Sequence, residues 1–283
     1  MTGTMLADVR RRQGNPVADW LRMAAAVTAA GFRRYSTYRQ ATVGAAVTVT
    51  VFGFLKCYLI LAVAGPAGTV AGYRGDQLVA FIWIGQGLFG VVAMWGWSEL
   101  SDRVRTGDVA ADLLRPVNPL WTYACTDLGR IGHALAMRLL VPVVVGALTF
   151  HLYAPRLWAT YPAFLVSAVL GGMVSFALRY LVNLSSFWLL DIRGVMTAWV
   201  LCSSLFSGLT MPIGFFPAWA RAVLWLTPFP AIMQVPLDTA LERHVGWPAA
   251  GMIGLQVAWV VALLAICWLV QRRAVRRLVV QGG

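Results

Sequence analysis

Charged residues are scarce in this chain of 283 residues: lysine, arginine, aspartate and glutamate make up 12% of it, against about 25% in a typical soluble domain. Hydrophobic residues make up 59%, and the mean hydropathy is +0.71. A single water-soluble core has no room for that much apolar surface. The composition therefore excludes a soluble enzyme. It also excludes a disordered chain, because disorder requires low hydrophobicity.

Motifs for nucleotides and metals are missing as well. The only lysine, Lys56, is followed by Cys57, whereas a P-loop ends in lysine and then serine or threonine. If ATP powers this protein, ATP and Mg²⁺ are therefore bound by a partner chain. The four cysteines have no C-x-x-C spacing and the three histidines are scattered. We expect no disulfide framework, no zinc or haem site, and no cofactor bound by this chain.

What the sequence does contain is a series of apolar runs, each close to the roughly 20 residues that cross a bilayer. There are six, at 41–64, 77–97, 134–153, 158–182, 194–216 and 249–270. They predict an all-α integral membrane protein with six transmembrane helices. Residues 1–40 form a tail with an interfacial helix, 41–270 the transmembrane domain, and 271–283 a basic tail. The first 40 residues contain no apolar core of a cleavable signal peptide, so the first span directs insertion.

Positive charge is distributed unevenly between the gaps. Sixteen of the 23 lysines and arginines lie on the side that holds both termini, and four lie on the other side. The positive-inside rule then places both termini in the cytoplasm. The net charge of +12 is an orientation signal, so we expect no nucleic-acid partner.

Ionisable residues inside the spans are few. The eleven carboxylates all fall outside the predicted span interiors, which disfavours a carrier driven by an acidic proton relay. Arg138 and Arg179 fall near cytoplasmic ends, where interfacial anchoring is favoured over a substrate role. Lys56 lies mid-way along the first span. Either it has a polar partner or a water-filled cleft, or its role is structural, and both interpretations remain open.

Two cytoplasmic segments have helical signals. Asn15-Pro16 predicts a helix start, followed by an apolar stripe flanked by arginines. This pattern is typical of an amphipathic interfacial helix, acting as a peripheral anchor or contacting a cytoplasmic partner. The second segment, 98–130, reads as two short helices and a third that begins at Asn118-Pro119 and runs into the third span. Spacing alone does not decide whether this loop grips a partner or is ordinary solvated loop.

Local signals inside the 98–130 loop give finer expectations. Glu99 and Arg103 are spaced for an i, i+4 ion pair. Gly107 is expected to end the first helix and Asp108 to cap the second, which stops before Pro116.

A further segment is too interrupted for one helix. Prolines and glycines break the apolar stretch after the fifth span. Non-helical backbone survives at membrane depth only when it is buried in protein or lines a cavity. We therefore expect a re-entrant outer hairpin over 207–240, with helices starting near Pro217 and Pro230, that caps the exit of a pathway. Glycines of the second and fourth spans allow close helix packing or face lipid: Gly85, Gly87, Gly90, Gly171 and Gly172.

Several stretches resemble a known family. They are YRQATVGAAVTVTVFGFLK (38–56), WIGQGLFG (83–90), ELSDRVRTGDVAADLLRPVNPLW (99–121), DLGR (127–130), FW (187–188), SGLTMPIGFFP (207–217) and PFP (228–230). Together they resemble the permease subunits of bacterial type-2 ABC exporters, in the subgroup encoded with a second permease and a separate ATPase. The RTGDVAADLLRP stretch is the most specific part.

The resemblance implies a permease of the bacterial cytoplasmic membrane that pairs with a second permease, as a homodimer or heterodimer, and contacts membrane lipids. It implies that two ATPase subunits bind the first cytoplasmic loop and the N-terminal helix. Substrates of the wider class are drugs, lipids and glycans. Candidate ATPase-docking residues are the charged members of the loop, namely Glu99, Asp102, Arg103, Arg105, Asp108, Asp112 and Arg115. Candidate pathway residues are Lys56 and an aromatic lid formed by Phe215, Phe216, Trp219 and Trp225.

Two other classes stay as alternatives. A secondary transporter or channel requires ion-coupling residues or inverted repeats, and the two halves show no self-similarity. A membrane-embedded enzyme requires paired carboxylates or a nucleophile constellation. Asp108 and Asp112 are a close acidic pair, but both lie in the segment assigned to partner docking.

Overall fold

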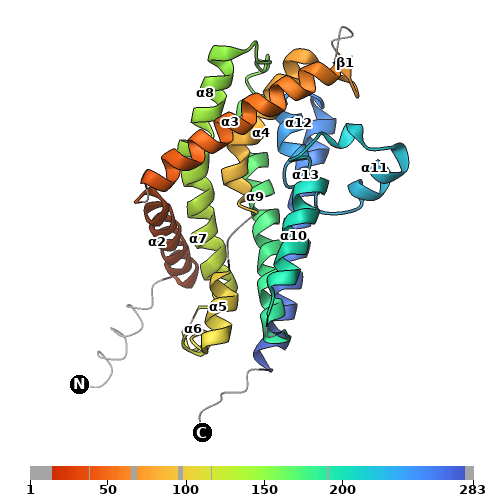
Figure 1. Ribbon diagram of the computed structural model, residues 1–283. Coiled ribbons are helices and arrows are strands. Elements are labelled where there is room, and N and C mark those ends of the chain that lie inside the picture. Colours follow the sequence, from red (N-terminus) through yellow and green to blue (C-terminus); the bar gives the residue numbers. More distant parts are fainter. Residues whose placement is uncertain are drawn as a thin grey trace, which may run out of the picture.

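The computed structural model describes residues 15–37, 39–64, 69–94, 98–115, 117–189 and 191–277. The regular secondary structure of these residues is helical apart from one two-stranded hairpin, β1 (Thr69–Val70) and β2 (Tyr73–Arg74). Figure 1 shows the long helices side by side, with α5 and the end of α13 at the lower end and the hairpin at the upper end. The predictions for Arg10, Arg11, Arg12, Trp97 and Pro116, and for 278–283, lie outside the described residues.

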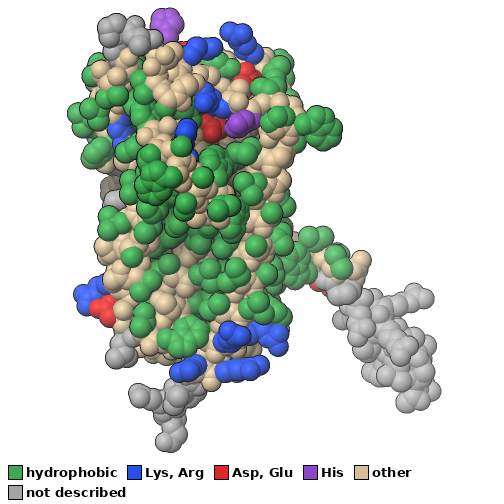
Figure 2. Space-filling view, turned by 90° about the vertical axis from the view of Figure 1, so that its right-hand side faces the viewer, with side chains coloured by type: hydrophobic (Ala, Val, Ile, Leu, Met, Phe, Trp, Pro, Cys, Tyr) green, Lys and Arg blue, Asp and Glu red, His purple; other side chains and the backbone are tan. Residues whose placement is uncertain are grey.

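Five helical segments of the described chain are long and apolar enough to cross a membrane: Thr42–Ala64, Gly75–Val92, Pro119–Thr149, Thr160–Phe187 and Trp247–Val275. They correspond to five of the six expected spans. The element bounds are α3 (Arg39–Ala64), α4 (Gly75–Val92), α7 (Pro119–His133), α8 (Leu140–Thr149), α9 (Thr160–Leu184) and α13 (Trp247–Val275). Figure 2 shows apolar side chains over the middle of one face, with arginines at its two ends.

The remaining expected span, 194–216, is shorter as a helix. α10 (Arg193–Phe206) has 14 residues. At 1.5 Å per residue it is about 21 Å long, against about 30 Å for a bilayer core. The helix stops where Gly208 takes a φ of +91° and Pro212 follows, and only the 3-10 turn η4 (Ile213–Phe215) continues the segment. Turn-forming residues inside an apolar run therefore shortened this helix.

The helix that contains the third span begins at Pro119, as expected. α7, the π-helical segment η2 (Ala134–Arg138) and α8 follow one another as a 31-residue candidate span from Pro119 to Thr149. The expected helix that starts at Asn118-Pro119 and runs into the third span is therefore confirmed. Asp127 and Arg130 lie in the α7 part of this long helix.

The N-terminal helix α2 (Pro16–Ser36) begins where expected, and the side chain of Asn15 accepts a hydrogen bond from the Val17 amide at 3.1 Å. α2 lies against α7 (Figure 1). Two glycines allow this contact. A Cβ at Gly129 would overlap the backbone carbonyl of Thr28, and one at Gly31 would overlap that of Thr126.

Glycines of the other helices also permit close packing. A Cβ at Gly171 would overlap the Ile232 carbonyl, and one at Gly87 would overlap Leu139. A Cβ at Gly172 would lie 2.7 Å from the Ile131 side chain, and one at Gly90 would lie 2.7 Å from the Arg138 side chain. Close approach, rather than a lipid-facing position, therefore explains these four. Gly85 differs, since its added Cβ would meet Leu237 at an ordinary 3.8 Å.

The segment after α10 carries two short helices, α11 (Ala218–Trp225) and α12 (Gln234–Ala240). α11 begins directly after Pro217, as expected, and α12 begins at Gln234 rather than near Pro230. α12 is buried against α9 and α4. Its Gln234 and Asp238 form a buried hydrogen-bonded cluster with Tyr73 of β2, in which the tyrosine hydroxyl donates to Asp238 at 2.8 Å. The cluster ties this segment to the hairpin between α3 and α4.

Glu242 fixes the loop between α8 and α9. Its carboxylate accepts hydrogen bonds from the Tyr153 and Thr160 hydroxyls and from the Arg156 and Leu157 amides, at 2.5–3.1 Å. Burial alone would raise the pKa of this carboxyl, but the four hydrogen bonds outweigh burial and lower the pKa to about 2.

A pH dependence follows for this loop. A lowered folded-state pKa stabilises the loop above the unfolded value of about 4.3, and the stabilisation is lost as the pH falls towards about 2. Hydrogen exchange of the 150–157 amides, corrected for intrinsic rates, should therefore accelerate between about pH 4 and about pH 2. In Glu242→Gln the loop should exchange fast throughout. A wild-type loop with no acid transition would contradict this assignment.

Candidate functional site

Two short helices connect α4 to α7 in the chain. α5 (Glu99–Thr106) ends at Gly107, whose φ of 84° gives the left-handed C-cap that the sequence predicts. α6 (Val109–Leu113) follows at once. Leu100 and Val109 are buried and hold the pair against the rest of the fold. The two-helix prediction for this loop is confirmed, and Asn118 caps α7 as expected by accepting from the Leu120 amide at 2.9 Å.

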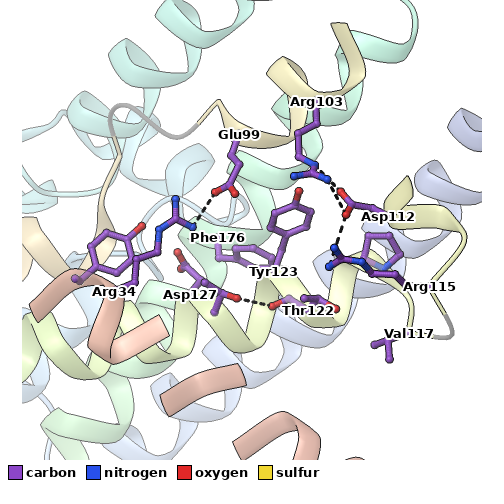
Figure 3. Close-up of a pocket in the computed structure, with 13 residues that line it drawn as sticks. Arg34, Glu99, Arg103, Asp112, Arg115, Val117, Thr122, Tyr123, Asp127 and Phe176 are labelled. Atoms are coloured by element: carbon purple, nitrogen blue, oxygen red, sulfur yellow. Dashed lines mark hydrogen bonds and ion pairs between the residues drawn. The ribbon is translucent and has the colours of Figure 1, made fainter. Parts of the chain in front are cut away.

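The ion pairs of this loop differ from the expected ones (Figure 3). Glu99 pairs with Arg34 of α2 at 3.3 Å, and Arg103 pairs with Asp112 of α6 at 2.6 Å. The expected Glu99–Arg103 pair was therefore wrong, because each partner finds a better-placed charge on another helix. Asp108 occupies the N-cap position of α6 but accepts from the Thr106 hydroxyl at 2.8 Å and makes no cap hydrogen bond.

A pocket of about 150 Å³ lies between these helices and α2. Figure 3 shows charged side chains from α2, α5, α6 and α7 converging on it. Its charged lining residues are Arg34, Glu99, Arg103, Asp112, Arg115 and Asp127. Oppositely charged side chains of α2, α5, α6 and α7 therefore meet at this pocket.

The seven candidate docking residues fall into two groups. Asp112 is 8% exposed, and Glu99 and Arg103 are partly covered by their ion pairs. These three hold the loop together. The other four are exposed, namely Asp102, Arg105, Asp108 and Arg115. Leu114, beside them, is 87% exposed, and no hydropathy pattern singled it out.

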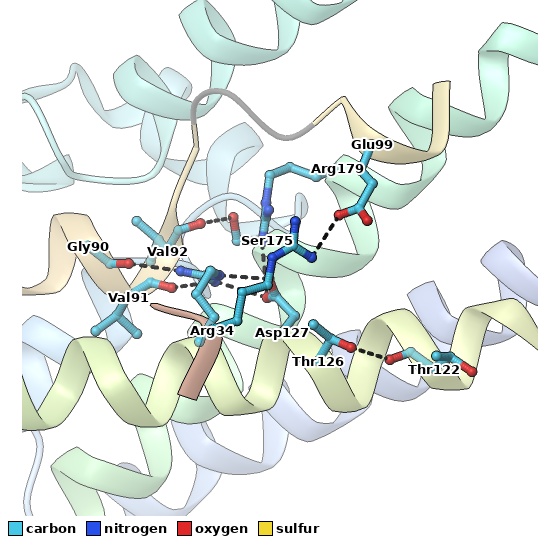
Figure 4. Close-up of polar contacts among 11 residues, drawn as sticks. Arg34, Gly90, Val91, Val92, Glu99, Thr122, Thr126, Asp127, Ser175 and Arg179 are labelled. Atoms are coloured by element: carbon cyan, nitrogen blue, oxygen red, sulfur yellow. Dashed lines mark hydrogen bonds and ion pairs between the residues drawn. The ribbon is translucent and has the colours of Figure 1, made fainter. Parts of the chain in front are cut away.

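Behind the pocket lies a buried charge cluster that the sequence analysis missed (Figure 4). Asp127 pairs with Arg130 at 2.7 Å and with Arg179 of α9 at 3.1 Å. The prediction that Arg179 anchors the helix at the membrane interface was wrong, because this residue is 1% exposed. Asp127 lies outside the span interiors expected from the sequence but within the long candidate span Pro119–Thr149. The signal available in the sequence was the i, i+3 spacing within DLGR on a helix.

The cluster reaches the end of α4. Arg130 donates to the backbone carbonyls of Gly90 at 2.8 Å and Val91 at 2.9 Å. Ser175 of α9 donates to the Val92 carbonyl at 2.6 Å (Figure 4). Because α5 follows α4 in the chain and α6 precedes α7, the cluster fixes both ends of the loop that carries the exposed charges.

The first pathway candidate, Lys56, lies in a pocket of about 310 Å³ between α3 and α4. Its Nζ donates to the Leu209 carbonyl at 3.3 Å, and Phe215 lines the same pocket. The structure therefore brings these two candidates together. Phe216, Trp219 and Trp225 do not line this pocket, and Trp219 is 74% exposed.

These features define a multi-pass helical membrane protein with a charged two-helix loop fixed to its spans. Within the described ranges, no group of three or more metal-ligating side chains comes together. Residues 47–282 match the family described as ABC-2 family transporter protein, so the chain belongs to the ABC-2 transporter family. No curated protein and no solved structure matches the chain.

The family match confirms that the chain resembles ABC-2 transporters, as the sequence motifs indicated. The chain is an ABC transporter permease, a multi-pass membrane component whose substrate the family does not define. Permeases of this family lack an ATPase domain, and membrane subunits of ABC transporters generally pair with ATPase subunits.

Proposed function

We propose that the chain is the permease subunit of an ATP-driven exporter of the bacterial cytoplasmic membrane. It pairs with a second permease, and two ATPase subunits drive it. Its substrate is a hydrophobic or amphipathic molecule. In this arrangement α10 and the segment after it complete a sixth crossing, both termini face the cytoplasm, and 207–240 forms the re-entrant outer hairpin.

One observation carries this proposal. The α5–α6 loop presents exposed charges outward while Asp127, Arg130 and Arg179 fix its two ends to α4, α7 and α9. A force applied to α5 and α6 is therefore transmitted to spanning helices rather than absorbed by a loose loop. This is what a permease without its own nucleotide site requires from its docking surface.

The chain alone should hydrolyse no ATP, since ATP is bound by the partner. Turnover should appear only when an ATPase subunit copurifies with it. Steady-state phosphate release, measured with and without the copurified ATPase, checks this expectation. ATP hydrolysis by the isolated chain would contradict it.

Reversing two exposed charges of α5 should break docking. The double variant Asp102→Lys/Arg105→Glu keeps the net charge. It should reduce ATPase capture in a pull-down about tenfold or more, because rim charges set partner recognition. Expression and membrane insertion should be unchanged, since both side chains are exposed and exposed charges contribute little to folding.

The matched control is Arg74→Glu/Asp76→Lys, which swaps an exposed pair at the hairpin end of the fold, opposite α5 (Figure 1). It should retain ATPase capture. If the α5 variant binds the ATPase as well as this control does, the loop is ordinary solvated surface and the docking assignment is wrong.

A further inference from the structure

The contact between α3 and α4 is flanked by two pockets. α3 crosses α4 where Gly53 meets the ring of Trp83. One pocket, of about 310 Å³, contains Lys56. The other, of about 180 Å³, contains Arg138 of the π-helical segment. Gln86 of α4 lines both pockets. We call the two pockets together the α3–α4 groove.

The groove has positive charge without a counter-charge. Its lining contains Lys56 and Arg138 but no aspartate or glutamate. Neither cation is among the residues that form ion pairs in the described part of the chain. The Nε of Arg138 is buried and has no hydrogen-bond partner there. Lys56 has only the Leu209 carbonyl, at 3.3 Å.

Gln86 supplies a second, independent sign of a ligand. Gln86 is 7% exposed, and its side-chain amide takes part in none of the hydrogen bonds among the described residues. The amide atoms of Gln86 are not fully enclosed by the described residues, so they reach the open space of the pockets. The amide lines both pockets, so a molecule in the groove can supply the missing partner.

Apart from Thr42, Thr48 and Thr210, the rest of the lining is apolar. Leu59, Ile60 and Val63 of α3 face Phe81 and Ile82 of α4 in the larger pocket, and alanines and valine line the smaller one. Along α3, Val49 of the smaller pocket and Lys56 of the larger one are about 10 Å apart at 1.5 Å per residue. A largely apolar groove that contains two cations without a counter-charge suits a chain-bearing molecule whose headgroup is negative.

We propose that the α3–α4 groove binds an amphiphile with an anionic headgroup, a phosphate or a carboxylate, that Arg138, Gln86 and Lys56 contact in turn. This inference rests on the proposed function when the amphiphile is the exported substrate. An anionic phospholipid of the surrounding membrane has the same chemistry and is the other source. A cationic amphiphile is excluded from the groove, because it would add a like charge beside two unpaired cations.

The test uses the purified full chain in nanodiscs of zwitterionic phosphatidylcholine. The probes are dodecyl phosphate and dodecyltrimethylammonium, which share one alkyl chain and differ in headgroup charge. Calorimetry should show dodecyl phosphate binding and no binding of the cation above that of empty nanodiscs. Lys56→Met and Arg138→Met keep most of each side-chain stem and remove the charge. Each should weaken dodecyl phosphate about tenfold, the usual loss for a charge-assisted contact.

Arg221→Met is the matched control, since it removes the same charge from an exposed position on α11 outside the groove. Its affinity should equal that of wild type. Lys56→Arg should keep tight binding, which separates loss of charge from loss of fold. Equal binding of both probes, or full affinity in both groove variants, would overturn the proposal. Loss of binding when a copurified second permease is present would overturn it too, because a protein partner would then fill the groove.

A second arm separates the two sources. The ATPase-containing complex is reconstituted in phosphatidylcholine vesicles with and without phosphatidylglycerol. ATP-driven movement of dodecyl phosphate that phosphatidylglycerol does not abolish identifies the groove as part of the export path. Binding to the chain without ATP-driven movement supports a lipid site and rejects the export function alone, so the two failures are distinguishable.

Discussion

Replacing Asp127 by asparagine is expected to destabilise the protein by about 3–5 kcal/mol, the typical cost of breaking a buried ion pair. The substitution keeps the shape of the side chain but removes the negative charge that Arg130 and Arg179 both contact. Both arginines are at most 6% exposed, so water cannot replace the carboxylate. Thermal unfolding of the purified chain, followed by tryptophan fluorescence, measures the loss.

Two further variants serve as comparisons for the stability loss of Asp127→Asn. Arg179→Met should cost less than Asp127→Asn, because the neutral Asp127–Arg130 pair remains. Asp19→Asn disrupts an exposed pair with Arg22 and should change stability by less than about 1 kcal/mol. If Asp127→Asn unfolds no more easily than Asp19→Asn, the cluster is not what fixes α7 to α9.

Replacing Gly129 by alanine is expected to detach α2 from α7. Alanine is normally favoured over glycine within a helix by about 1 kcal/mol. Here the added Cβ would overlap the Thr28 carbonyl of α2, and backbone cannot move aside as a flexible side chain can. The preference should therefore reverse, with a loss of about 1–3 kcal/mol typical of overpacking.

Hydrogen exchange over 15–37 locates the effect, since a detached α2 loses protection while α9 keeps it. The control is Gly132→Ala on the same helix, whose Cβ would meet the Phe32 ring at an ordinary 3.7 Å. This control should be neutral or stabilising. Equal protection of α2 in the two variants would show that the glycine contact does not hold α2.

Much of the fold is local in origin and was therefore predictable from the sequence. Five spans follow from runs of apolar residues, because a bilayer core selects for length and hydropathy alone. The caps at Asn15, Gly107 and Asn118 follow from residue types whose side chains or φ values suit helix ends. Such signals act within a few residues and need no knowledge of tertiary contacts.

What could not be predicted depends on partners distant in sequence. Glu99 has a correctly spaced Arg103 on its own helix, yet it pairs with Arg34 of another helix. The ion pair of Asp127 with Arg179 could not be expected, because the two residues lie on different helices and are distant in the sequence. The candidate site has the same limit. Sequence patterns named Lys56, but only the packing of α3 on α4 adds Gln86 and Arg138 to its groove.

The π-helical turn at Ala134–Arg138 changes the direction in which the side chains of α8 point relative to those of α7. Each residue of an α-helix advances the side-chain direction by about 100°, so one wide turn rotates everything beyond it. α7 needs one face for α2, where Gly129 sits, and α8 needs another for Trp83, where Gly146 sits. A uniform helix would align one of these faces at the expense of the other. The π-turn contains one more residue than an α-helical turn, so one continuous helix can present Gly129 to α2 and Gly146 to Trp83.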